Sequence, residues 1–166
     1  MNTITSLYTT NDGRIARKNW WLGVIGLAVV SIVLALVLGL AGLGPSAATG
    51  VGGWGQFIVF LLLLYPSLCL SLKRRHDRDN NGMDVKILFG ASVVLQLLQV
   101  LGVGLTPTDI GGGVMVAMPA TWLTVLYFIF GIAGLYMLVV LGFLRGTAGE
   151  NSYGANPVGG RWAAAA

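Results

Sequence analysis

One short charged segment holds the residues whose types could do acid–base chemistry. It runs from Lys73 to Gly82 and contains His76 beside Asp77, the one acid–base pair that can be drawn in the chain. Neighbouring residues in a loop cannot both point at one reacting atom unless a fold supplies that geometry. A Ser-His-Asp triad is excluded, because the single histidine is adjacent to its acid. We predict no catalytic residues, and a membrane enzyme that uses His76 is the remaining enzymatic alternative.

Metal and cofactor sites find equally little support. The order Asp77, Asp79, Asn81, Gly82 is similar to a calcium loop, but Leu88 stands where the loop needs a glutamate. One cysteine and one histidine leave no pair with metal-ligand spacing and no intrachain disulfide. We therefore predict no metal site and no cofactor.

The elements that position the charged segment are strongly apolar. Of 166 residues, 55% are hydrophobic and 10% are charged, and the mean hydropathy is +0.80. This composition excludes a soluble globular domain and indicates an integral membrane protein. A pI near 9.6 does not point to nucleic acid, because the basic residues lie in short clusters beside apolar runs.

Four apolar runs are long enough to cross a bilayer. No charged residue occurs from Asn19 to Leu72, which suits two spans of ~20 residues with a glycine-rich turn at 44–53 between them. We predict an all-α membrane protein with four transmembrane helices, arranged as two helical hairpins joined by the charged segment. The predicted parts are an N-terminal segment 1–18, a transmembrane domain 19–144 with spans at 20–43, 54–72, 85–105 and 120–144, and a tail 145–166.

The segments outside the spans carry their own expectations. Ile4, Leu7 and Tyr8 share one face of a short interfacial helix in one interpretation, and a frayed terminus is the other. Residues 106–119, with their glycines and prolines, are expected to form a loop. The Gly- and Asn-rich tail is expected to be mostly extended or disordered.

Lysine and arginine are confined to alternate connections. Three precede the first span, five lie in or just after the charged segment, and two lie in the tail, whereas 44–53 and 106–119 carry none. By the positive-inside rule, both termini and the charged segment face the cytoplasm. We expect a multi-pass protein of the bacterial cytoplasmic (inner) membrane.

Three polar side chains recur along one face of the third span, at i, i+4 and i+7: Ser92, Gln96 and Gln99. Amides that face acyl chains lack partners, so this stripe is expected to face another helix, where each bond contributes on the order of 1 kcal/mol. The alternative is a substrate path. Faces of small residues for close helix packing are expected in the first and fourth spans, at Ser31, Ala35, Gly39, Gly131 and Gly134.

Three separated stretches carry a family pattern. They are Gly-Arg-Ile-Ala-Arg-Lys before a pair of tryptophans (13–21), a proline followed by clustered bases, His-Asp and a glycine (66–82), and a closing run with Gly, Asn, Tyr-Gly and Pro (146–157). In this order the stretches resemble the small bacterial inner-membrane proteins catalogued as domain of unknown function 805. The resemblance implies a four-helix inner-membrane protein and no particular reaction.

All three stretches fall at the cytoplasmic edge of the predicted topology. We expect a polar cluster there, in which Asp77 accepts from an arginine and Tyr153 packs over the interface. The same bases attract anionic headgroups by ~1 kcal/mol each or dock an acidic surface, unless they serve only to fix the topology. The residues expected in the cluster or in the lipid or partner contact are Arg14, Arg17, Lys18, Lys73, Arg74, His76, Asp77, Asn151 and Tyr153.

These observations favour a non-catalytic protein. We expect a structural or accessory subunit of a membrane assembly, or a module that contacts anionic lipid. The expected partners are membrane lipids and other membrane subunits or a second copy, and not nucleic acid. The alternative is a small oligomeric transporter or channel with the polar stripe along its path, which a water-filled cavity between the spans would favour.

Overall fold

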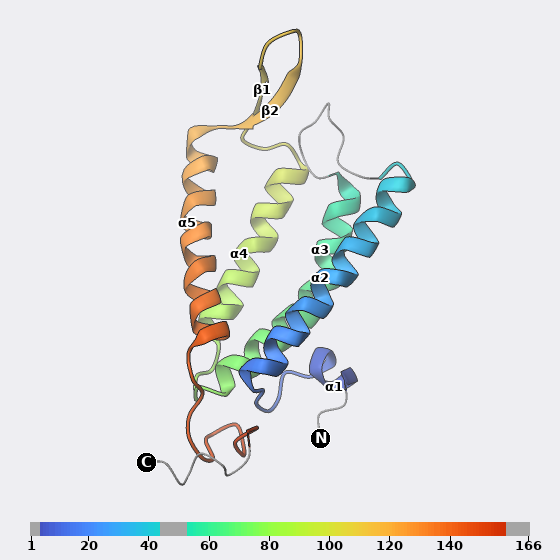
Figure 1. Cartoon of the computed structure of the whole chain (residues 1–166). Coiled ribbons are helices and arrows are strands. Elements are labelled where there is room, and N and C mark those ends of the chain that lie inside the picture. The colour runs from blue at the N-terminus through green and yellow to red at the C-terminus, as the bar shows by residue number, and fades with distance from the viewer. Residues whose placement is uncertain (1–3, 44–52, 159–166) are drawn as a thin grey trace.

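The computed structural model describes residues 4–43 and 53–158 (Figure 1). The elements in chain order are α1 (Ile4–Thr9), α2 (Arg17–Leu40), α3 (Trp54–His76), α4 (Met83–Val100), β1 (Leu105–Asp109), β2 (Met115–Pro119), α5 (Thr121–Leu138) and the π-helix η1 (Val139–Phe143). The long helices run between two ends of the molecule. The basal end carries α1, residues 73–82 and the segment after η1, and the hairpin end carries β1 and β2.

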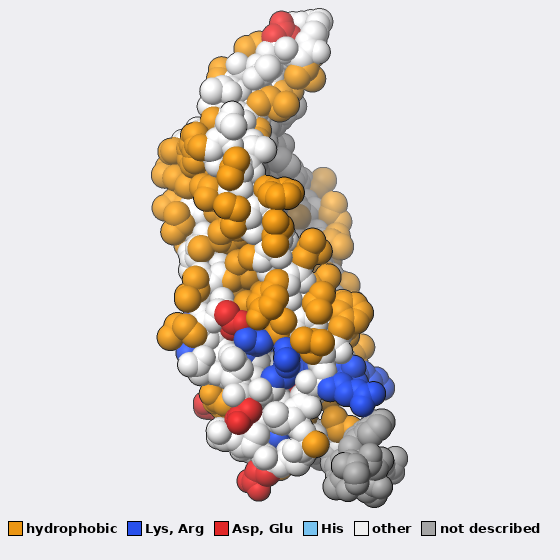
Figure 2. All heavy atoms as spheres, turned by 90° about the vertical axis from the view of Figure 1, so that its left-hand side faces the viewer, with side chains coloured by type: hydrophobic (Ala, Val, Ile, Leu, Met, Phe, Trp, Pro, Cys, Tyr) orange, Lys and Arg blue, Asp and Glu red, His pale blue; other side chains and the backbone are white. Residues whose placement is uncertain are grey.

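Four helices are long and apolar enough to cross a membrane, which confirms the predicted number of spans. They are α2, α3, α4 and the continuous helix formed by α5 and η1. Figure 2 shows hydrophobic side chains along most of one face and Lys and Arg side chains in a band near the basal end. So extensive an exposed apolar surface is suited to lipid and not to water. The chain is a multi-pass membrane protein.

The second span is longer than predicted. Instead of ending at residue 72, α3 continues through the basic residues 73–75 and ends at His76. Basic side chains are favourable in the last turn of a helix, because its free carbonyl groups carry partial negative charge. The connection to α4 is therefore only residues 77–82, and it closes at Gly82, whose positive φ of 67° suits glycine.

Residues 105–119 are not the predicted loop. β1 and β2 form an antiparallel hairpin in which Leu105 lies opposite Pro119, so the fold is not wholly helical. The prolines are tolerated because both strands of a two-stranded sheet are edges, and the glycines 111–113 make the turn with positive φ. A Cβ added at Gly104 would overlap the Trp122 ring, which shows how closely the hairpin packs on the start of α5.

The buried core lies towards the basal end. It is formed by Ile15, Trp20, Leu70, Leu72, Val85, Met137, Val140 and Leu141. There α2 packs closely on α3, since a Cβ added at Gly23 would lie 2.7 Å from the Leu70 side chain. In contrast, α5 makes its main contacts with η1 and β2, and not with α4. A Cβ added at Gly39, Gly131 or Gly134 would meet no described atom within 4 Å, so these three glycines make no close helix contact in the described chain.

Both ends of the described chain fold against the base. The N-terminal helix is present as α1, and Tyr8 Oη donates to the Gly23 carbonyl at 3.2 Å, so the N-terminal segment is not frayed there. The C-terminal segment, residues 145–158, includes a β-bridge between Asn151 and Gly154. For these residues the prediction of an extended or disordered tail is wrong. The predicted turn at 44–52 and the last residues, 159–166, lie outside the described residues.

Candidate functional site

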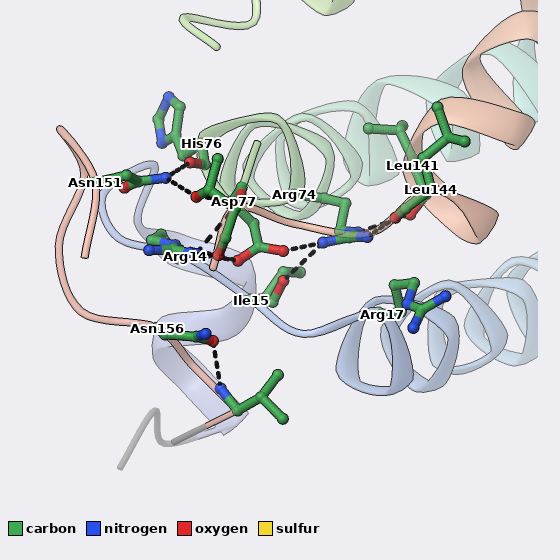
Figure 3. Close-up of polar contacts among 12 residues, drawn as sticks. Arg14, Ile15, Arg17, Arg74, His76, Asp77, Leu141, Leu144, Asn151 and Asn156 are labelled. Carbon is green, nitrogen blue, oxygen red and sulfur yellow. Dashed lines mark hydrogen bonds and ion pairs between the residues drawn. The ribbon is translucent and has the colours of Figure 1, made fainter. Parts of the chain in front are cut away.

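Asp77 lies at the centre of a buried polar cluster at the basal end (Figure 3). Arg14 Nε and Nη2 donate to its Oδ1 at 3.1 and 3.0 Å, and Arg74 Nη1 pairs with its Oδ2. The exposed fraction of each of these side chains is 6% or less. A buried charge is stable only when it is paired and hydrogen-bonded, and here one carboxylate faces two cations. The set that we call the basal cluster is Arg14, Arg74, His76, Asp77, Thr147, Asn151 and Tyr153.

Arg14 joins the N-terminal segment to the C-terminal segment. Its Nη1 donates to the carbonyl groups of residues 149 and 154 at 2.8 and 3.0 Å, and its Nη2 donates to the Thr147 carbonyl at 2.9 Å. Thr147 N in turn donates to the Asp77 carbonyl at 2.8 Å. The fixed fork of donors on a guanidinium suits such a junction. One side chain therefore ties together three segments that are distant in sequence.

Side chains from α2 and α3 close the end of the fourth span. The last four carbonyl groups of a helix lack intrahelical donors, and here the carbonyls of residues 141–144 each accept from a side chain. Arg74 Nε donates to the Leu141 carbonyl at 2.8 Å, and Arg74 Nη2 donates to the Leu144 carbonyl. Trp21 Nε1 donates to the second at 3.1 Å and Arg17 Nη1 to the third at 3.0 Å. This arrangement fixes η1 against the bases of α2 and α3.

His76 does not face Asp77. Its imidazole stacks on the Tyr153 ring with the centroids 3.9 Å apart and the planes 3° apart, and it points away from the Asp77 carboxylate in Figure 3. Asn151 Nδ2 donates to the His76 carbonyl at 2.8 Å. His76 Nδ1 is buried without a hydrogen-bond partner among the described residues. The acid–base pair of the sequence is thus not a dyad in space, and the imidazole acts as a packing surface for the C-terminal segment.

Lys73 and Arg75 flank the basal cluster with partners of their own. Lys73 is 1% exposed, and its Nζ donates to the carbonyl groups of residues 6 and 7, which holds α1 against α3. Arg75 Nε donates to Asp84 Oδ1 at 3.1 Å in the first turn of α4. These two cations are buried, as are the two arginines of the cluster. Arg14, Lys73 and Arg74, which were expected in the polar cluster or in a lipid or partner contact, are thus bonded inside the protein.

Arg17 and Lys18 remain exposed. Figure 3 shows Arg17 outside the bonded network around Asp77, and Lys18 makes no hydrogen bond or ion pair with any described residue. Both line a pocket of about 410 Å³ between the start of α2 and the C-terminal segment. Arg145, Gly146, Thr147 and Asn156 line its other side. Of the predicted site residues, these two are therefore the ones that present charge to an outside ligand.

The polar stripe of the third span opens on a second cavity. Ser92 and Gln96 line a space of about 310 Å³ among α2, α3 and α4, together with Ser31, Gln56 and Ser67. Gln99 is not among its lining residues. Ser92 Oγ donates to the Phe89 carbonyl of its own helix at 2.7 Å. The Gln56 and Gln96 amides have no hydrogen bond with a described residue.

Sequence reasoning missed two residues that the basal cluster requires. A Cβ added at Gly146 would overlap the Asp77 carboxylate, so glycine alone fits there without a shift. Thr147 Oγ1 donates to the Asp77 carbonyl at 3.2 Å and accepts from Asn151 Nδ2 at 2.9 Å. Both residues lie in the third family stretch, 146–157, so the family pattern could have indicated them as it indicated Asn151 and Tyr153.

The fold and the basal cluster together define a class of protein. It is a small multi-pass helical membrane protein whose N-terminal segment, α3 and C-terminal segment meet in one ion-paired cluster. Across residues 4–43 and 53–158, no three His, Cys, Asp or Glu side chains are grouped to hold a metal ion.

The family model described as "Protein of unknown function (DUF805)" matches residues 8–155, and the chain belongs to this family. The match spans the basal cluster completely. No curated protein and no solved structure shows significant similarity to the chain.

Proposed function

We propose that the protein is a non-catalytic accessory subunit of an assembly in the bacterial cytoplasmic membrane. The observation that carries this proposal is the pair of glutamine amides, Gln56 and Gln96, in the cavity among α2, α3 and α4. An amide that lies inside a bilayer without a hydrogen-bond partner destabilises the structure by roughly several kcal/mol, the cost of moving a polar group out of water. A partner helix that carries a polar side chain would satisfy both amides.

His76 and Asp77, the acid–base pair of the sequence, do not converge on one point, which suits a non-catalytic role. Both oxygens of Asp77 are held by arginines, and the His76 imidazole stacks on Tyr153 instead of facing a cavity with the carboxylate. A general base must lie within reach of the proton that it removes. The side chains of the basal cluster instead make contacts that hold segments of the chain together.

The positions of the cations support the proposed orientation, with the basal end in the cytoplasm. The lysines and arginines of the described chain precede or begin α2, end or follow α3, begin α4, or follow η1. Those element ends meet at the basal end in Figure 1, and an excess of Lys and Arg marks the cytoplasmic side.

Site-specific photo-crosslinking in intact bacterial membranes tests the accessory role. A photoreactive residue at Gln96 is expected to give one reproducible protein adduct, because the partner side chain lies in the cavity. The same residue at Val94, which is 56% exposed on α4, is the matched control and is expected to give none. Gln96→Leu should weaken co-purification of the same partner. No protein adduct at Gln96, or equal adducts at both positions, would contradict the proposal.

The same cavity supports one alternative, a small transporter or channel. Among the described residues its polar lining is neutral, with three serines and two glutamines and no charged side chain. Such a lining suits small uncharged polar solutes and not ions. In proteoliposomes that hold the purified protein alone, this alternative expects glycerol or urea to enter faster than in empty vesicles, and Gln96→Leu to remove the difference. The accessory role expects no difference from empty vesicles.

A further inference from the structure

We infer that the pocket at the base of α2 binds the phosphate of an anionic phospholipid headgroup. The inference does not depend on the partner helix proposed above, because it concerns a different pocket. It turns a general attraction between basic residues and anionic lipid into one site with named contacts.

The pocket presents excess positive charge. The exposed Arg17 and Lys18 line it together with Arg145, whereas Arg74 and Asp77, which also line it, are paired with each other. That carboxylate is already shared by two arginines, one of them Arg14 from outside the lining. The lining therefore offers no carboxylate to Arg17 or Lys18, and an anion is the ligand that would supply the counter-charge.

The start of α2 adds donors to the same side of the pocket. Ala16, Arg17 and Lys18 line the pocket and are the N-cap and the first two residues of α2. The N-cap makes no side-chain capping bond, and no acidic residue lies in the first turn. Free N–H groups at a helix N-terminus favour phosphate. Together with the exposed side chains of Arg17 and Lys18, they supply both direction and charge.

The surface beside the pocket points to a lipid as the source of the phosphate. Leu22 lies one turn after the pocket-lining Lys18 in α2, Phe143 lies two residues before the pocket-lining Arg145, and each is 58% exposed. Above them α2 continues as an apolar span, along which an acyl chain can lie while its phosphate stays at the base. The volume of about 410 Å³ falls in the roughly 300–1,000 Å³ range of ligand pockets, enough for a glycerophosphate headgroup.

Native mass spectrometry of the full-length detergent-solubilised protein tests the inference. We expect phosphatidylglycerol to bind about tenfold more tightly than phosphatidylcholine, because each base near an anionic headgroup contributes of the order of one tenfold step or less. Lys18→Gln should weaken phosphatidylglycerol binding about fivefold, and Arg17→Gln with Lys18→Gln about 30-fold. Lys86→Gln, an exposed base of α4 outside the pocket, is the matched control and should leave binding unchanged.

Equal binding of the two lipids would overturn the inference, and so would an equal loss in Lys18→Gln and Lys86→Gln. Lys18 has no bond to a described residue, so Lys18→Gln should fold normally and decides the question even if the double variant is unstable. A last arm separates lipid from soluble phosphate. Glycerol 3-phosphate should not displace phosphatidylglycerol at millimolar concentration, and displacement at the concentration of the lipid itself would overturn the assignment to lipid.

Discussion

The two parts of this molecule are held together in different ways. At the basal end, one carboxylate and two arginines join segments that lie more than 60 residues apart in the sequence. Along the spans, most side chains face outward, and α5 makes its main contacts with η1 and β2 instead of α4. The charged side chains of the basal end pair with one another, whereas the spans expose faces that contact no other described part of the chain.

This difference follows from the surroundings of each part. In lipid, an apolar helix face gains little by leaving the acyl chains, so hydrophobicity alone does not choose its neighbour. A charged side chain near the membrane has few polar groups that can pair with it. A guanidinium also donates hydrogen bonds well only to acceptors that match its planar fork. The base therefore specifies which helix ends come together, and the spans stay available for lipid or for another protein.

Breaking the ion pairs at the base should have the largest effect. Asp77→Asn leaves Arg14 and Arg74 buried without a counter-charge, and removing one partner of a buried pair lowers the free energy of unfolding by about 3–5 kcal/mol. Unfolding in mixed micelles with increasing dodecyl sulfate measures it. Asp79→Asn is the control, because Asp79 is exposed and its φ of 55° suits asparagine. Equal losses of stability in both variants would show that Asp77 contributes no more to the basal end than an exposed aspartate does.

A smaller loss should follow from crowding the same carboxylate. A methyl group at Gly146 overlaps the Asp77 side chain, which is held in place by two arginines, so Gly146→Ala should destabilise the protein by about 1–3 kcal/mol. The matched change on the open part of the molecule is Gly134→Ala, which meets no described atom and improves helix propensity by about 1 kcal/mol at most. The same unfolding assay compares the two. Destabilisation by Gly134→Ala alone would reverse the contrast between base and spans.

The stacked rings contribute less. Tyr153→Ala removes the ring that packs on His76 and should lower stability by about 0.5–1.5 kcal/mol. Tyr153→Phe keeps the ring and is the control, expected to match the unmodified protein. Limited proteolysis of the C-terminal segment should follow the same order. A phenylalanine variant as weak as the alanine variant would mean that the hydroxyl group, and not the stacking, fixes this segment.

The smallest effect on the isolated protein is expected on α5. A Cβ added at Gly131 meets no described atom within 4 Å, so Gly131→Leu should cause no loss of stability, and better helix propensity raises the free energy of unfolding by about 0.8 kcal/mol at most. Unfolding of the purified protein measures this directly. A loss as large as that of Gly146→Ala would show that α5 is packed within the monomer after all, and would remove the contrast on which the other comparisons depend.

The sequence was sufficient for the spans and for the meeting of the basic stretches. Long apolar runs located all four helices, because length and hydropathy decide which segments cross a bilayer. Boundaries were less certain: the bases 73–75 indicated a loop, yet their side chains are buried in the last turn of α3. The hairpin at 105–119 was missed because its glycines and prolines, typical of loops, here make a turn and edge strands.

The detailed bonding of the base could not be predicted from local pattern. That Asp77 binds two arginines, and that Lys73 clamps α1 instead of joining the cluster, depends on contacts between segments far apart in sequence. The distribution of lysines and arginines predicts which side of the membrane a segment faces, but not which residue each of them pairs with. It also gave no reason to separate the buried Arg74 from the exposed Lys18, a distinction that decides which residues can bind a ligand.

Amide hydrogen exchange in the C-terminal segment tests the central claim most directly. Thr147 N bonds to the Asp77 carbonyl and Asn151 N to the Gly154 carbonyl, so both amides should be protected in the intact protein and should lose protection in Asp77→Asn. Exchange of both amides at the rate of an unstructured peptide in the unmodified protein would contradict the account.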